Sequence, residues 1–347
     1  MTPQPYPEIV ARFEQLVRSR RTDRTMTALI IDSPWLPGFA GENTLDFFFD
    51  DATWLDAYSG ALGALPGVAF VPGSWVEFGM AAEPTGWGAP VRWTGHEPPS
   101  LRRFPGGIEA LLECAPPDPE TDGLMPAALR RYERLAPELT RRGLAPRMAA
   151  ARGPLAVASH LMGVTEFLMA TKLDRDNCLA LLDRTTDLCI AWLSAQLARM
   201  DDPIAILVLD DVVGLINPND ADDLALGRLR RIFDAFPGLI HIFHNDTPNE
   251  KVYAGLATIG MDLFNFSHEI TVERARELLG AEIVLMGNVP PLDVLVRGTV
   301  DEVRASTEKL IESARRFGPL LVSPGGGVSP GTPIENLQAL AEVAETF

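Results

Sequence analysis

The chain has 347 residues, of which 46% are hydrophobic, so it can bury the core of a large globular protein. Its net charge of −17 repels phosphate groups, which disfavours nucleic acids and anionic membranes as partners. Residues 1–20 contain no apolar signal core, and no run of about 18 uncharged apolar residues occurs, so a soluble cytoplasmic protein is expected.

Short apolar runs alternate with helical patterns along the chain, which is typical of a parallel sheet covered by helices. Eight strands are predicted, at residues 27–31, 67–71, 155–159, 204–209, 239–243, 262–266, 283–286 and 320–322. This order predicts an α/β fold, a single (β/α)8 TIM-type barrel formed by residues 1–347. An N-terminal helix precedes the first strand, and a helical insertion, including residues 127–142, lies between the second and third strands.

Two further helices follow from apolar periodicity. Residues 174–200 form a long helix whose apolar stripe contains Cys178 and Cys189, and Thr299 with Glu302 caps a helix over residues 300–317. The third cysteine is Cys114, and no C-x-x-C spacing occurs, which argues against a disulfide framework and a cysteine-rich zinc site.

Polar residues follow the predicted strands, where the chemistry of a barrel is expected. In chain order these residues are Asp32, Glu77, His160, Asp210, Asp211, His241, His244, Asp246, Asn265, His268 and Asn288. A strand-end aspartate is often a helix N-cap, and a lone strand histidine is often a hydrogen-bonded core residue. Residues with such independent structural roles would be distributed over both ends of the barrel. The four histidines His160, His241, His244 and His268 are instead predicted at one end, and they are expected to face one cavity. Alternation should send one of Asp210 and Asp211 inward and the other toward the helices.

Residues 320–328, LLVSPGGGV, have the pattern of a buried strand that ends in three glycines, whose backbone can approach a ligand closely. Thr332 is predicted as the N-cap of the following helix, with Pro333 in its first turn and Glu335 closing a capping box. The segment indicates a βα corner at a ligand site.

Together with residues 285–291 (LMGNVPP) and 153–163 (GPLAVASHLMG), this corner resembles the uroporphyrinogen decarboxylase superfamily. That superfamily contains porphyrinogen decarboxylases and zinc-dependent methyltransferases that move methyl groups to or from a corrinoid protein. The resemblance covers most of the chain, best from about Gly153 onward, and implies the same barrel. It also implies a corrinoid on a separate partner protein, because this chain has no D-x-H-x-x-G cobalamin signature.

The resemblance also bears on zinc. It places His241 at the histidine and Phe243 at the cysteine of the family's His-x-Cys zinc motif, and Gly326 at the second zinc cysteine. Both thiolates are therefore absent, which disfavours zinc activation of a thiol acceptor. A metal held by His241, His244, His268, Asp211 and Asp246 would have only nitrogen and oxygen ligands, and a metal-free site is favoured.

The porphyrinogen decarboxylases of the family carry arginines after the first strand to bind a substrate with many carboxylates. No Lys or Arg occurs here between Arg24 and Arg92, so porphyrinogen decarboxylation is not expected. The first loop, with Trp35, and the phenylalanines at 47–49 place large apolar groups near the predicted barrel mouth. They would close over a substrate, dock a partner or pack a lid onto the barrel.

The favoured function is transfer of a methyl group from a small methylated or methoxylated substrate to a corrinoid partner. The candidate acids are His160, His244 and His268, with Asp211 or Asp246 orienting one of them. The candidate substrate-binding residues are Asp32, Trp35, Glu77, Asp210, His241, Phe243, Asn265, Asn288 and Gly326. Two alternatives remain: a decarboxylase or other lyase acting on a small, weakly charged substrate, and a catalytically silent binding barrel.

Overall fold

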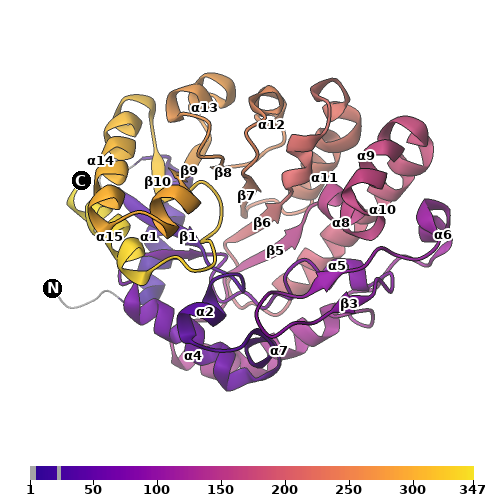
Figure 1. Ribbon diagram of the computed structural model, residues 1–347, viewed down its shortest axis with the longest axis horizontal. Coiled ribbons are helices and arrows are strands. Elements are labelled where there is room, and N and C mark those ends of the chain that lie inside the picture. The colour runs from indigo at the N-terminus through magenta and orange to yellow at the C-terminus, as the bar shows by residue number, and fades with distance from the viewer. Residues whose placement is uncertain (1–4, 22–24) are drawn as a thin grey trace.

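The computed structural model describes residues 5–21 and 25–347. Within this part, eight parallel strands form one sheet with the order β2-β1-β10-β9-β8-β7-β6-β5. The strands are β1 (Met26–Ile30), β2 (Ala69–Val71), β5 (Met148–Arg152), β6 (Ala205–Leu209), β7 (Ile240–Asn245), β8 (Leu263–Phe266), β9 (Val284–Val289) and β10 (Leu320–Pro324). The sheet curls into a nearly closed TIM-type barrel, with β2 and β5 as its two end strands (Figure 1).

Helices cover the outside of the barrel, and Figure 1 shows α10 to α14 as an arc around the strands. The helices are α1 (Tyr6–Ser19), α2 (Leu36–Ala40), α3 (Thr44–Phe49), α4 (Asp51–Ala64), α5 (Ala82–Thr85), α6 (Gly107–Glu113), α7 (Met125–Arg141), α8 (Pro154–Met162), α9 (Val164–Leu173), α10 (Arg175–Leu197), α11 (Gly227–Asp234), α12 (Tyr253–Leu256), α13 (Val272–Leu279), α14 (Val300–Phe317) and α15 (Ile334–Thr346). No helix among the described residues has the length and apolar composition needed to cross a membrane.

Helix α1 closes the end of the barrel at which the strands begin. It contacts both β2 and β7, and the hydroxyl of Tyr6 accepts a hydrogen bond from the backbone N–H of Phe70 in β2. Phe13 on the same helix is fully buried. The opposite end, where the strands finish, is therefore the end left for a ligand.

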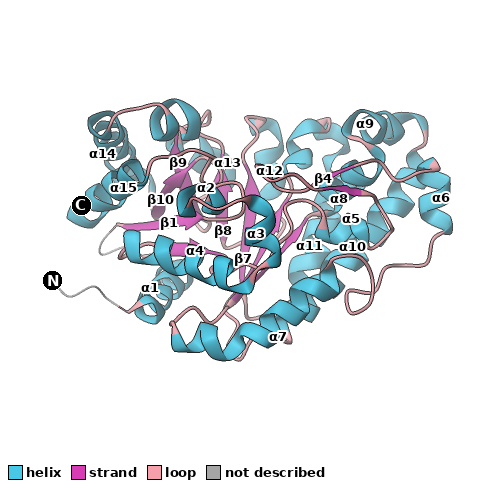
Figure 2. Ribbon diagram, turned by 60° about the horizontal axis from the view of Figure 1, so that its bottom comes forward, coloured by secondary structure: helices cyan, strands magenta, loops and turns pink. Residues whose placement is uncertain are grey.

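The predicted helical insertion between β2 and β5 is confirmed. It contains α5, α6 and α7, and also a two-stranded antiparallel hairpin of β3 (Val91–Arg92) and β4 (Ser100–Leu101), which the sequence did not indicate. Helix α7 packs beside α4, as Figure 2 shows, and the Tyr132 hydroxyl accepts a hydrogen bond from the backbone N–H of Val76. The insertion is thereby fixed to the chain that leaves β2.

Seven of the eight predicted strands are confirmed, and the third is wrong. Residues 155–159 lie in helix α8, and the strand is β5, seven residues earlier. Pro154 occupies the first turn of α8, and the segment is apolar throughout because both sides of this short helix are buried. A fully buried helix and a fully buried strand give the same apolar run, so periodicity alone cannot separate them.

Two of the predicted helix features are confirmed and one is wrong. Thr299 forms the capping box of α14, and the two cysteines of α10 are buried, as expected. Thr332 does not cap α15, which begins at Ile334 after Pro333, and its hydroxyl instead donates to the Ser329 carbonyl at 2.8 Å. The glycine corner is therefore held by a turn rather than by a capping box.

Candidate active site

A cavity of about 380 Å³ lies at the carboxyl ends of the strands. Its titratable or charged lining residues are Asp32, Arg152, Asp211, His244 and Asp246, which follow or end strands β1, β5, β6 and β7. The rest of the lining is largely apolar and includes several prolines and the backbone of the C-terminal glycine corner. An apolar hollow with a few convergent polar groups is the usual form of a small-molecule site.

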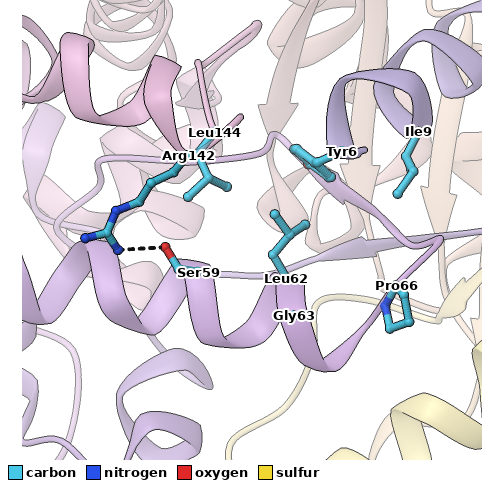
Figure 3. A pocket seen from close by; sticks show the side chains of 8 residues that line it. All are labelled: Tyr6, Ile9, Ser59, Leu62, Gly63, Pro66, Arg142 and Leu144. Atoms are coloured by element: carbon cyan, nitrogen blue, oxygen red, sulfur yellow. Dashed lines mark hydrogen bonds between the residues drawn. The ribbon is translucent and has the colours of Figure 1, made fainter. Parts of the chain in front are cut away.

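A second cavity, of about 550 Å³, lies at the opposite end of the barrel between α1 and α4 (Figure 3). Arg142 is the charged residue in its lining, and its guanidinium is bonded to Asp56, Glu138 and Ser59. The remaining lining side chains drawn in Figure 3 are uncharged. This cavity therefore offers no free group for chemistry, despite its larger volume.

His244 is held in one orientation at the end of β7. Its Nδ1 lies 2.7 Å from Oδ1 of Asn265 in β8. The amide nitrogen of Asn265 donates to the carbonyl oxygens of Met286 and Pro324, so Oδ1 is the acceptor that faces the ring. Nδ1 of His244 therefore carries a proton, and Nε2 is the atom left to act in the cavity.

Nε2 of His244 lies 3.4 Å from Oδ1 of Asp211, whose other contact is the backbone N–H of Asp246 at 3.1 Å. Burial opposes a charge on His244, but the negative charge and hydrogen bond of Asp211 outweigh burial and raise the pKa of His244 to about 9. Burial also raises the pKa of Asp211, but the charge of His244 prevails and the net shift is downward. The two residues form an imidazolium–carboxylate pair at neutral pH.

Asp32 occupies the opposite wall of the cavity, after β1. Burial and the neighbouring carboxylate of Glu77 raise the pKa of Asp32 to about 7, against the charges of Arg152 and His244. Glu77 does not line the cavity, and its carboxylate accepts the backbone N–H groups of Ser33 and Gly79. Asp32 can therefore exist in both protonation states near neutral pH. Glu77 holds the loop that carries Asp32 in place through these backbone hydrogen bonds.

Arg152 is the functional candidate that the sequence reasoning missed. It is the last residue of β5, lines the cavity, and is only 7% exposed. Because the third strand was predicted seven residues too late, Arg152 was not recognised as a strand-end residue. The signal that could have found it is the pair Gly153-Pro154, since proline favours the first turn of a helix and so marks the strand as already finished.

The prediction that His241 faces the same cavity is wrong. Its ring nitrogens lie 2.9 and 3.0 Å from the carbonyl oxygens of Gly260 and Phe236, and the ring stacks on Phe233 of α11. Phe243 points to the same side of β7, is fully buried and stacks on Phe264. Strand alternation puts both residues toward the helix layer and His244 toward the cavity, so neither of the two lines the cavity.

His160 and His268 lie near the carboxyl ends of the strands but not in the wall of the cavity. His160 is in the last turn of α8 rather than at a strand end, and burial together with the charge of Arg152 lowers its pKa to about 4. His268 follows β8 and is exposed. Only one of the four predicted histidines, His244, therefore lines the cavity.

Three other predicted binding residues have structural roles. Asp210 is fully buried, and its Oδ2 accepts the backbone N–H of Leu155 at 2.9 Å, so Asp211 is the inward member of the pair. The indole N–H of Trp35 donates to the Thr332 carbonyl, which packs the first loop onto the glycine corner. Asn288 donates to the carbonyl oxygens of Ser267 and Ile270. None of these three lines the cavity.

The donor set at the cavity does not fit a thiolate-bound zinc. Phe243 faces the helix layer, and a Cβ added at Gly326 would lie 2.8 Å from Oδ2 of Asp246, so the carboxylate already fills that space. Asp211, His244 and Asp246 place one ligand atom each within 4.8 Å of one another, but they supply only nitrogen and oxygen. Such a set suits harder divalent ions and cannot provide the thiolate ligation implied by the resemblance.

A family model described as uroporphyrinogen decarboxylase (URO-D) matches residues 73–347, and the chain belongs to this family. A methylated-thiol–coenzyme M methyltransferase of Methanosarcina mazei is 26% identical over 222 residues, which are 63% of this chain and 58% of that protein. A methylcobamide:CoM methyltransferase of Methanosarcina barkeri is 24% identical over 203 residues, 58% of each chain. The matched part thus spans little more than half of these relatives.

The fold itself has a close counterpart among solved structures. A methyltransferase from Methanosarcina mazei superposes with a TM-score of 0.83, covering 98% of both chains at 19% identity. This likeness confirms the barrel that the sequence predicted.

Proposed function

We propose that this protein is a methyltransferase that takes a methyl group from a small methylated or methoxylated compound and passes it to a corrinoid on a separate protein. The observation that carries the proposal is the His244–Asp211 pair in the cavity, because the oxygen, nitrogen or sulfur of an uncharged methyl donor leaves more readily when an acid protonates it. The relatives named as methylcobamide and methylated-thiol methyltransferases support the reaction type. The single-domain organisation stays a prediction.

In the proposed reaction the corrinoid cobalt supplies the electron pair that accepts the methyl group. The bond between the methyl carbon and its heteroatom breaks, and the heteroatom takes the proton from Nε2 of His244. Asp211 keeps His244 protonated at neutral pH, and Asn265 keeps Nε2 directed at the cavity. A positioned acid of this kind contributes about 10²–10⁴-fold to a rate.

The surroundings of the cavity suit a partner protein. Met80, 38% exposed, lines the cavity. Large exposed apolar side chains also occur in the segments that follow three strands, at Phe49 after β1, Leu215 after β6 and Leu292 after β9. A cavity of about 380 Å³ holds a small substrate, so a corrinoid would have to approach from outside its opening.

The experiment is an anaerobic transfer assay with chemically reduced cobalamin as the acceptor and a panel of methyl ethers, methylamines and methyl thioethers as donors. Conversion of the reduced to the methylated cobalamin spectrum by at least one donor supports the proposal. His244→Ala should abolish most of this conversion. Absence of transfer from every donor class, with either cobalamin or corrinoid protein as acceptor, would contradict it.

A further inference from the structure

Arg152 lines the cavity, and its guanidinium has no carboxylate partner among the described residues. The structure describes three arginines that are less than about a tenth exposed, namely Arg131, Arg152 and Arg276. Arg131 bonds to Asp51 and the Phe48 carbonyl. Arg276 bonds to three backbone carbonyls, those of Gly280, Ile283 and Pro319. These two guanidinium groups each make at least two short hydrogen bonds within the fold, although Nη1 of Arg131 and Nε of Arg276 are buried without a partner.

Arg152 is different, because its guanidinium makes a single long hydrogen bond, from Nη2 to the Gly79 carbonyl at 3.3 Å. Its Nε is buried with no partner, and no carboxylate of the described residues lies within 4.0 Å of the group. Asp32, Asp211 and Glu83 feel its charge at longer range. An unpaired buried guanidinium costs several kcal/mol, so the fold alone does not account for it.

The group is also held in place. The guanidinium lies over the indole of Trp75, 5.2 Å from the ring centroid, and the backbone N–H of Arg152 donates to buried Glu83 at 2.7 Å. One face is therefore covered by an aromatic ring, and the N–H groups of Nη1 and Nη2, unlike buried Nε, are left for the cavity that Arg152 lines. A planar fork of free donors matches a carboxylate, which accepts two parallel hydrogen bonds.

We infer that Arg152 binds a carboxylate of the substrate, so that the methyl donor of the proposed function is a small molecule with an apolar body and one carboxylate. The apolar lining from Ile30, Leu209 and Val328 would receive the body between Arg152 and His244. Asp32, whose carboxyl can be protonated near neutral pH, would then donate to the same anion rather than repel it. The methyl-transfer part rests on the proposed function, whereas the anion site is tested by binding alone.

The test is calorimetric binding of two matched probes, 4-methoxybenzoate and its neutral amide 4-methoxybenzamide, to the full chain without any corrinoid. The wild-type protein should bind the carboxylate at least roughly tenfold more tightly than the amide. Arg152→Gln should weaken carboxylate binding by roughly 10- to 100-fold and leave amide binding little changed, as expected for a lost charge-assisted pair. Arg152→Lys should keep part of the preference for the carboxylate over the amide, since lysine retains the positive charge but lacks the planar pair of N–H donors.

Arg276→Gln is the matched control for folding, because it removes a buried guanidinium whose Nη1 and Nη2 bond to three backbone carbonyls. It should lower the thermal unfolding midpoint clearly, whereas Arg152→Gln should lower it little. Equal affinity for the two probes, no binding of either at millimolar concentration, or a loss of stability in Arg152→Gln as large as in Arg276→Gln would overturn the inference. Carboxylate binding through Arg152 without any methyl transfer would instead contradict the proposed function alone.

Discussion

His244 and Asn265 are joined by a hydrogen bond of 2.7 Å that fixes which ring nitrogen of the histidine faces the cavity. In this bond His244 donates and Asn265 accepts, because the amide nitrogen of Asn265 already donates to the carbonyl oxygens of Met286 and Pro324. Asp211 then faces the other ring nitrogen, and the proton available for chemistry lies on Nε2.

His244→Ala should lower turnover by roughly 10²–10⁴-fold, the usual contribution of a positioned acid, with little change in folding. His241→Ala is the matched control, since it removes a histidine of the same strand whose ring bonds to backbone carbonyls among the helices. It should cost stability and leave turnover per folded molecule unchanged. Steady-state kinetics with thermal unfolding of both variants checks this, and unimpaired His244→Ala turnover would remove His244 from the mechanism.

The pH profile of turnover should fall on the alkaline side with a midpoint at about 9, because His244 must be protonated to act and Asp211 raises its pKa to that value. Asp211→Asn removes the stabilising charge while burial remains, so the alkaline limb should move to lower pH. Asp293→Asn, at an exposed carboxylate bonded to Arg297, should leave the limb in place. An alkaline limb that is the same in Asp211→Asn and wild type would exclude this pairing.

The stability of the fold should respond to the same pair. A histidine whose folded pKa lies above its unfolded value of about 6.5 stabilises the protein fully below that pH. This contribution should decline as pH rises through about 9 and be absent in His244→Ala. Denaturant unfolding at several pH values measures it, and parallel curves for the two proteins would count against a charged His244.

Purified protein should lack stoichiometric zinc and stay active after chelation. The reason is that no cysteine lies at the cavity, where Asp211, His244 and Asp246 provide only oxygen and nitrogen. Elemental analysis before and after treatment with a chelator gives the answer. About one bound metal per chain, lost together with activity, would show instead that these three residues are ligands.

Uroporphyrinogen III should not be decarboxylated. Arg152 is the only Lys or Arg among the residues that line the cavity, and the loop after β1 has none, so a multiply charged anion would meet three aspartates against Arg152 and a His244 already paired with Asp211. Chromatography of the reaction products is the measurement. Formation of coproporphyrinogen by the purified protein would refute the prediction.

Gly153→Ala should destabilise the fold by about 1–3 kcal/mol, the usual cost of overpacking, because the new Cβ would lie 2.4 Å from Oδ2 of buried Asp210. Gly63→Ala is the control, since nothing lies within 4 Å of its added Cβ and it sits in helix α4. That change should stabilise by roughly 0.5–1 kcal/mol. Chemical denaturation of both variants tests the contrast, and equal effects would contradict the close packing of α8 on Asp210.

The barrel and the most important site residues could be predicted from sequence, because strand ends of a parallel barrel converge whatever the details of packing. Asp32, Asp211, His244 and Asp246 came from that rule and all line the cavity. His241 is the exception to this rule. The position of β7 was predicted, but the face of the strand that points into the barrel was not. A histidine whose ring bonds to backbone carbonyl oxygens cannot be recognised from the sequence alone.

Arg152 shows a second limit. Its strand, Met148–Arg152, is rich in alanine, which has weak strand preference, while the helix after it contains an unbroken apolar run of strand length. Burial in the folded protein, rather than local residue preference, therefore determines where this strand lies. Because the strand was predicted seven residues too late, Arg152 was not recognised as a strand-end residue. That its Nε has no hydrogen-bond partner and its Nη2 only a long one could only be learned from three-dimensional structure.

The most direct test of methyl transfer is to follow an isotopically labelled methyl group. The protein would be incubated anaerobically with reduced corrinoid and 4-methoxybenzoate labelled in its methyl carbon, and the label located by NMR. The account predicts label on the corrinoid and 4-hydroxybenzoate in equal amount, at a rate that His244→Ala lowers and His241→Ala does not. Label that stays on the methoxybenzoate while the cavity binds it would contradict the account.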